Sequence, residues 1–282
     1  MRKLLSLLFF AVLMSCQSSD TSTVMEQPDP TKLQKVIWYP DGPAEKHWNF
    51  NADGLLAEVT TPDGSVLQTF QYDGNHRLIA VVGQGYSKSF GYDDANFLTS
   101  IDETPVVYSY DATGGKYTRP LDVPDGAEPD LFPYQSEVLI NLEGLTRKST
   151  HFYGDPAAGT GFQTTEASAT FVNGNMTHIY RGDDTEENYE FDEQVNPLKE
   201  ALLPICRAMI GSIVWICGDY YSDNNVTQQR YAPEDPESLT YFYNYNSLGL
   251  PIERVSQFNY LGVPEGGTSV NARYYYQGDV IP

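Results

Sequence analysis

One short phrase recurs along the first half of the chain: an aromatic residue, then Asp or Asn, loosely specified residues, and an apolar run. It reads FQYDGNHRLIAVV from Phe70 and FGYDDANFLTSID from Phe90. The lead aromatic residues lie 22, 20 and 18 positions apart, at Phe50, Tyr72, Tyr92 and Tyr110. A phrase copied at this spacing predicts a repeated structural unit, because a catalytic pair is not normally copied four times.

Each position of the phrase has a physical role in a β-hairpin. The residue after the lead aromatic can accept hydrogen bonds from the turn that it opens; these residues are Asn51, Asp73, Asp93 and Asp111. Three positions later the chain must reverse, which favours Gly or Asn in a left-handed conformation. The residues at this position are Gly54, His76, Asn96 and Gly114, and histidine is the one that adopts a left-handed conformation least readily. The next anchor is Leu56, Leu78 or Leu98, and Lys116 breaks the pattern.

Turn signals recur about every ten residues, which leaves only short strands between them. The sequence therefore predicts an all-β fold, an antiparallel meander that forms a curved, extended sheet. A late phrase, YFYNYNSLGLPIERV, echoes the repeat with Tyr245, Asn246 and Gly249. One short covering helix is expected near residues 197–210, because Asn196 can cap it and Pro197 can occupy its first position.

The composition divides the chain into segments. Residues 36–117 form the repeat meander, and residues 118–133 form a proline- and acid-rich loop. Residues 134–282 form a second β-rich part, which contains the short helix and is expected to continue the first.

The amino terminus has the features of an export signal. Residues 1–15 combine Arg2 and Lys3 with an apolar run that is too short for a permanent membrane helix. The run ends in LMSC, which resembles a bacterial lipobox and predicts lipidation of Cys16. The alternative is an ordinary signal peptide with an incidental cysteine. With lipidation at Cys16, residues 16–35 are the lipidated cysteine and a polar, flexible tether.

Charge limits the range of partners. The chain has 38 acidic and 17 basic residues, and loss of residues 1–15 changes the net charge from −21 to −23. Such a surface repels nucleic acid, so no nucleic-acid partner is expected. The predicted partners are the membrane, through the lipid anchor, and an envelope protein or glycan.

The sequence contains none of the usual catalytic motifs, such as Gly-x-Ser-x-Gly, His-Glu-x-x-His or Cys-x-x-Cys. No catalytic residue, cofactor or metal is therefore predicted, and the four histidines are scattered. Cys206 and Cys217 either close a disulfide, as the expected compartment allows, or remain two buried thiols.

The Tyr72-Asp73, Tyr92-Asp93 and Tyr110-Asp111 phrases resemble the YD repeats of Rhs-type proteins, in which strings of hairpins coil into a β-sheet shell. Together with the lipobox and the acidic charge, they resemble envelope lipoproteins of the Bacteroidota with YD-like strands. The resemblance implies location and fold, and no catalytic residues. Gln17 after the anchor cysteine is not the aspartate that retains bacterial lipoproteins at the inner membrane, which implies an outer membrane location.

Three functions remain open at this point. The favoured one is a non-enzymatic envelope lipoprotein that serves as a scaffold or protein-interaction module. The second is a surface lipoprotein that binds glycan or peptide on exposed rings such as those of Tyr241, Tyr243, Tyr274, Tyr275 and Tyr276. The third is a hydrolase, which would need two acids converging in a pocket.

Overall fold

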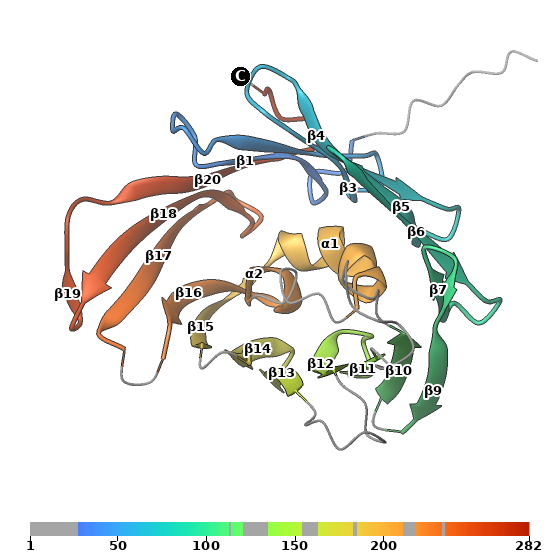
Figure 1. Ribbon diagram of the computed structural model, residues 1–282. Helices are drawn as coiled ribbons and strands as arrows, with labels where there is room; N and C mark the ends of the chain where they lie inside the picture. Colours follow the sequence, from blue (N-terminus) through green and yellow to red (C-terminus); the bar gives the residue numbers. More distant parts are fainter. Residues whose placement is uncertain are drawn as a thin grey trace, which may run out of the picture.

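The fold is a long antiparallel sheet that curls round two helices (Figure 1). The structure is a computed structural model, and it describes residues 28–112, 114–120, 135–153, 163–182, 185–210, 218–232 and 235–281. The predicted all-β antiparallel fold is confirmed.

The strands before residue 118 are short. They are β1 (Leu33–Trp38), β2 (Lys46–Phe50), β3 (Leu56–Thr60), β4 (Val66–Tyr72), β5 (Leu78–Gly83), β6 (Tyr86–Tyr92), β7 (Leu98–Ile101), β8 (Thr104–Pro105), β9 (Val107–Asp111) and β10 (Gly114–Pro120).

The later elements include the longest strands and both helices. They are β11 (Gln135–Ile140), β12 (Thr146–Tyr153), β13 (Gln163–Val172), β14 (Asn175–Tyr180), β15 (Glu186–Val195), α1 (Pro197–Ala208), α2 (Gly218–Tyr221), β16 (Asn224–Arg230), β17 (Glu237–Tyr245), β18 (Pro251–Tyr260), β19 (Val263–Pro264) and β20 (Ser269–Tyr276).

The sheet is nearly closed. Consecutive strands pair from β1 through to β8, and again from β9 through to β19. Strand β20 then pairs with both β18 and β1. Between the two runs, the Val106 N–H donates to the Thr99 carbonyl at 2.8 Å. The curved sheet expected from the sequence is therefore also almost continuous round the molecule.

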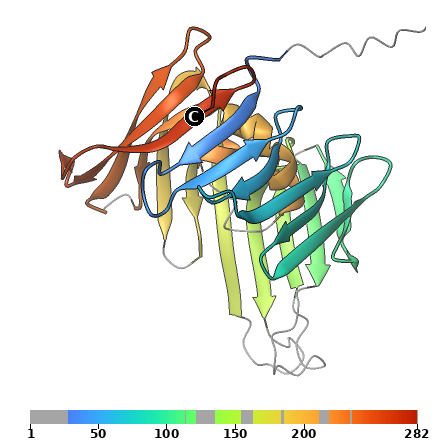
Figure 2. The same ribbon diagram turned by 90° about the horizontal axis from the view of Figure 1, so that it is seen from above.

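The core lies inside the curl of the sheet. Helix α1 fills this space, as both ribbon views show (Figure 1 and Figure 2). The buried residues Leu198, Leu202 and Ile205 of α1 belong to the same hydrophobic cluster as the strand residues Leu56 and Leu78. The predicted helix therefore covers the sheet from the inside. The two-turn apolar face of α1 gives the concave side of the strands a surface to pack on.

The amino-terminal cap of α1 follows the sequence prediction. The Asn196 side chain accepts a hydrogen bond from the Leu198 N–H at 3.0 Å, and Pro197 is the first helical residue. The short helix α2 was not predicted, because four residues give no periodic pattern to read.

Candidate functional site

The Asp and Asn residues of the repeat hold the turns. In the second copy, the Asp73 Oδ1 accepts hydrogen bonds from the N–H groups of Asn75 and Arg77, at 2.9 and 3.0 Å. The same pair of bonds, to the residues two and four positions later, recurs in the other regular copies. The residues that accept them there are Asn51, Asp93 and Asn246. These side chains satisfy backbone donors that the sheet leaves unpaired.

The reversal positions have the expected left-handed backbone. The φ angle is +81° at Gly54, +60° at His76, +70° at Asn96 and +76° at Gly249. His76 adopts this conformation although a side chain there is strained, and its Nε2 lies 3.5 Å from Asp53 of the neighbouring turn.

The tyrosine hydroxyls of the repeat tie one hairpin to the previous one. The Tyr72 hydroxyl donates to the Leu56 carbonyl at 2.7 Å, and the Tyr92 hydroxyl donates to the Leu78 carbonyl at 2.8 Å. Each acceptor is the buried leucine that begins the strand after the preceding turn. The tyrosine of each copy therefore serves a structural purpose, and burial raises the pKa of both phenols.

The fourth copy departs from the others. Asp111 pairs directly with Gly114, and Tyr110 pairs with Gly115, so the strands close one residue earlier than in the regular copies. The prediction that Tyr110 and Asp111 form the same unit is wrong in this respect. The Tyr110 ring is 54% exposed, whereas the tyrosines of the second and third copies are partly buried.

A further copy was missed in the sequence. The Asn141 Oδ1 accepts hydrogen bonds from the N–H groups of Glu143 and Leu145, both at 3.0 Å, and Gly144 has a φ of +83°. Ile140 stands where the other copies have an aromatic residue, so a search keyed on tyrosine overlooks it. The spacing of Asn141, Gly144 and Leu145 was the available signal.

The late echo holds a second polar contact. Besides the turn that Asn246 and Gly249 form, the Tyr245 hydroxyl donates to Asp192 of the strand β15. Asp192 also accepts from the Asn225 N–H at 3.2 Å. Burial and this hydrogen bond raise the Tyr245 pKa. The contact links β15, β16 and β17 at one end of the sheet.

The rings considered as a glycan platform do not form one. Tyr241, Tyr274 and Tyr276 are at most 8% exposed, and Tyr243 and Tyr275 are half-buried. Tyr241, Tyr274 and Tyr276 belong to the core cluster and Tyr243 packs against it, because these four lie on the core-facing side of their strands. The Tyr243 hydroxyl donates to the Val226 carbonyl at 3.0 Å. The exposed platform that the second function would need is therefore absent at these described rings.

A buried cation holds α2 to the sheet. The Arg254 Nη1 contacts both carboxylate oxygens of Asp219, at 2.9 and 2.8 Å, and the Arg254 Nε donates to Asn271 at 2.7 Å. The guanidinium also lies between the rings of Trp38 and Tyr241, at 4.8 and 4.6 Å from their centroids. Desolvation of Arg254 is outweighed by Asp219, so the Arg254 pKa lies above its usual range.

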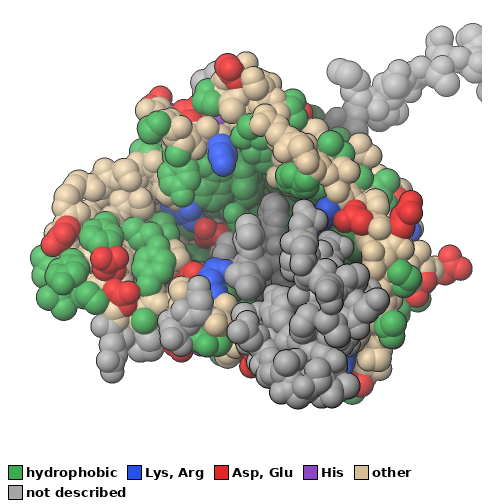
Figure 3. Space-filling model, viewed as in Figure 1, with side chains coloured by type: hydrophobic (Ala, Val, Ile, Leu, Met, Phe, Trp, Pro, Cys, Tyr) green, Lys and Arg blue, Asp and Glu red, His purple; other side chains and the backbone are tan. Residues whose placement is uncertain are grey.

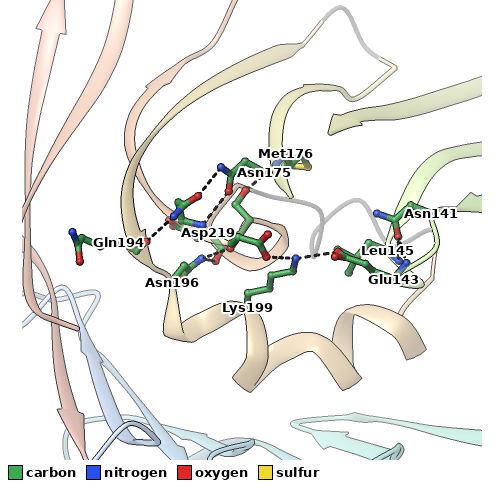
Figure 4. A network of polar contacts seen from close by, with 12 residues as sticks. Asn141, Glu143, Leu145, Asn175, Met176, Gln194, Asn196, Lys199 and Asp219 are labelled. Atoms are coloured by element: carbon green, nitrogen blue, oxygen red, sulfur yellow. Dashed lines mark hydrogen bonds and ion pairs between the residues drawn. The ribbon is translucent and has the colours of Figure 1, made fainter. Parts of the chain in front are cut away.

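A second polar network fixes α1 (Figure 4). Lys199 is only 6% exposed, and its Nζ lies 2.6 Å from Asp223 and 3.0 Å from Glu143. Burial lowers the pKa of Lys199, but the hydrogen bonds to these two carboxylates raise it more. In the same view, Asn196 reaches back from the start of α1 to the Asp219 carbonyl at 2.7 Å. These contacts join α1 to the turn before β12 and to the segment before β16.

A cleft of about 570 Å³ lies between the repeat turns and one side of α1. The turns after β4, β6 and β11 form one side, and Glu200, Leu203, Pro204 and Arg207 of α1 form the other. A volume of this size is typical of a small-ligand site.

The cleft has an aromatic wall. The rings of Phe97 and Tyr108 stack with their centroids 4.2 Å apart, and the Tyr110 ring lies 5.9 Å from Phe97. Tyr108 also contacts the buried Tyr117 at 4.5 Å. Burial raises the pKa of Tyr108 to about 12. Because the fourth hairpin closes early, Tyr110 lies on the surface of the wall.

Arg77 fixes the rim of the cleft. Its Nη2 lies 2.6 Å from Asp73, and its Nη1 donates to the Asp93 carbonyl and to Asn96, at 3.1 and 3.0 Å. Its guanidinium also covers the Tyr92 ring, 4.9 Å from the centroid. One side chain thus holds two successive turns together.

Hydrophobic side chains are also exposed far from the cleft. Figure 3 shows them gathered over β17, β18 and β19, with acidic side chains among them and along the rim. The exposed residues of this region are Phe242, Phe258, Tyr260, Leu261 and Val263.

Two predicted features concern residues that are outside the described part. Cys16, with its signal segment, is one, and lipidation stays a prediction. Cys217 is the other. Cys206 is fully buried, and a disulfide with Cys217 stays a prediction, as does the alternative of two buried thiols. Within the described ranges, no helix is long and apolar enough to cross a membrane, and no cluster of His, Cys, Asp and Glu could hold a metal ion.

Comparison with known proteins identifies the repeat. Residues 50–86, from the end of β2 to the start of β6, match the family model of the RHS repeat. The match confirms the predicted YD-repeat character of this segment. Comparison with curated proteins gave no match.

Two solved structures show weak similarity over most of their length. A porin-like protein from Bacteroides uniformis ATCC 8492 shares 10% identity at a TM-score of 0.32, over 89% of this chain and 100% of that one. A porin-like protein from Bacteroides vulgatus ATCC 8482 shares 9% identity at a TM-score of 0.36, over 88% and 99%. At such TM-scores neither similarity bears on the fold or function of this chain.

Proposed function

We propose that this protein is a non-enzymatic, lipid-anchored scaffold of the bacterial outer membrane that presents an interaction surface to an envelope protein. The observation that carries the proposal is that the polar groups of the regular repeats already form hydrogen bonds within the fold. Their Asp and Asn side chains accept bonds within the turns, and the Tyr72 and Tyr92 hydroxyls bond to carbonyls. The interior is filled by α1. The proposed interaction with an envelope protein therefore uses the outer surface.

The hydrolase alternative finds little support in the cleft. Glu143 and Glu200 both line it, but both side chains are exposed, and Glu143 is paired with Lys199. An acid and base pair for glycoside cleavage needs environments that separate the two pKa values.

The lipid anchor is tested by metabolic labelling. Cells that express the full chain are grown with an alkyne fatty acid, and their membranes are fractionated. The wild-type chain should carry the label in the outer membrane fraction, and Cys16→Ser should lose both label and membrane association. A labelled Cys16→Ser chain would contradict the proposed anchor.

The scaffold role is tested by affinity capture from an envelope extract, run beside a glycan array. A saturable protein partner with a blank array supports the proposal. Glycan binding without a protein partner would contradict it and favour a sugar-binding lipoprotein.

A further inference from the structure

The charge of the cleft differs from that of the whole chain. Acidic residues outnumber basic ones by 38 to 17 in the sequence. Counted in the same way, the cleft is lined by two basic side chains, those of Arg77 and Arg207, and by two acidic ones, those of Glu143 and Glu200, with His76 beside them. A negatively charged group is therefore accommodated better here than on the remaining surface.

Arg207 is the basic residue with hydrogen-bonding capacity left. Its Nε donates to the Glu143 carbonyl at 2.7 Å, which fixes the arm of the side chain. The arm lies against Gly144, where an added Cβ would come within 3.2 Å of the Arg207 Cγ. The Nη1 and Nη2 groups make no hydrogen bond with the described residues. A pre-oriented guanidinium edge with two free nitrogens suits a carboxylate.

The other two basic groups are already engaged. Arg77 contacts Asp73, the Asp93 carbonyl and Asn96. His76 lies beside Asp53. They shape the rim and its charge, and the direct contact to an anion is left to Arg207.

Next to Arg207 the cleft is apolar. The stacked rings of Phe97, Tyr108 and Tyr110 form one wall, and the aliphatic side chains of Leu142 and Leu203 lie at the same opening. Leu142 is 65% exposed and Tyr110 is 54% exposed, so both offer surface that a ligand could bury.

Two of the side-chain oxygens that line the cleft are already engaged by the fold. The Asn141 side-chain oxygen accepts two bonds from its own turn, and the Asn96 side-chain oxygen accepts from Arg77. A sugar would bury several hydroxyls, and each one without a partner would cost binding free energy. One carboxylate beside one apolar group matches the Arg207 guanidinium and the aromatic wall beside it.

We propose that this cleft binds the carboxy-terminal end of a partner protein, with the terminal carboxylate on Arg207 and the last, apolar side chain against Phe97, Tyr108 and Tyr110. This inference rests on the proposed interaction function and names the kind of partner that the surface recognises. The aromatic wall selects an aromatic or large aliphatic last residue, and the guanidinium selects a free chain end over an internal segment.

The test uses the full chain in mild detergent and isothermal titration calorimetry. The probes are acetyl-Gly-Gly-Phe with a free carboxylate, the same peptide as its carboxy-terminal amide, and acetyl-Gly-Gly-Ala. The free acid with phenylalanine should bind about tenfold more tightly than its amide, because the amide cannot form a charge-assisted pair with Arg207. The alanine peptide should bind more weakly than the phenylalanine peptide.

The variants separate the two parts of the site. Arg207→Gln should abolish the preference for the acid, and Tyr110→Ala should weaken the binding of both phenylalanine peptides. Arg147→Gln is the matched control, because Arg147 is an exposed arginine on the adjacent β12 that does not line the cleft, and it should bind like wild type. Circular dichroism of each variant checks that the fold is unchanged.

Equal binding of acid and amide, or an Arg207→Gln variant with the wild-type preference, would overturn the proposal. Binding of glucuronate that depends on Arg207, without binding of the peptides, would reassign the cleft to an acidic sugar. Capture of a protein partner that acetyl-Gly-Gly-Phe does not displace would leave the scaffold role standing and remove the carboxy-terminal mode of binding.

Discussion

At the scale of single residues, the repeat is a set of hydrogen bonds. An Asp or Asn oxygen closes each regular turn on two backbone N–H groups, and a tyrosine hydroxyl satisfies a carbonyl of the previous hairpin. Both bonds use groups that would otherwise compete for water at the end of a strand. The aromatic-x-Tyr-Asp phrase is thus explained without chemistry beyond the fold.

Loss of one such tyrosine hydroxyl should measurably lower the free energy of unfolding. Tyr72→Phe leaves the Leu56 carbonyl without this donor and should lower the free energy of unfolding by about 1 kcal/mol. Tyr110→Phe is the matched control, since the exposed Tyr110 ring belongs to the irregular copy, and it should lie within about 0.5 kcal/mol of wild type. Urea unfolding of both variants gives the comparison, and equal loss in both would contradict this role of the repeat tyrosine.

At the scale of elements, single hairpins could be predicted from the sequence, but the elements that they pack against could not. The turns, the cap of α1 at Asn196 and the buried leucines follow from local patterns. The fourth hairpin kept the Tyr-Asp pair but has Lys116 in place of the leucine anchor, and it closes early at Gly114. The cleft joins turns after β4, β6 and β11 with α1, and no local pattern contains that juxtaposition.

The contact of α1 with its surroundings gives a prediction at this scale. Lys199→Met keeps the buried stem but removes the ammonium that joins Asp223 and Glu143, and it should cost about 1–2 kcal/mol of unfolding free energy. Lys148→Met is the matched control, because the Lys148 pair with Glu166 is exposed on both sides. Thermal unfolding should show a lower midpoint for Lys199→Met alone, and equal midpoints would mean that this network does not hold α1.

At the scale of the whole molecule, the sheet encloses many phenols. Burial raises the pKa of ten described tyrosines above the usual value of about 10: Tyr72, Tyr92, Tyr108, Tyr117, Tyr231, Tyr241, Tyr243, Tyr245, Tyr274 and Tyr276. The neutral phenol is thus favoured in the folded state. The buried neutral phenols therefore contribute fully to the free energy of unfolding below about pH 10. This contribution is lost as the pH rises from about 10 towards the folded pKa values, because the tyrosines of the unfolded chain lose their protons first.

The protein should therefore unfold cooperatively in alkali. Far-ultraviolet circular dichroism and tyrosinate absorbance, recorded together against pH, should show the main rise in tyrosinate coinciding with the loss of β signal. Complete ionisation with an unchanged dichroism spectrum would contradict the interior placement of these rings.

The closure of the sheet also constrains how the chain can acquire its structure. Strand β1 is one of the first segments to be synthesised, and its outer edge is covered only by β20, near the other end of the sequence. Until then the growing chain carries an open strand edge, which invites pairing with other chains. The sheet therefore cannot close on β1 until β20 has formed.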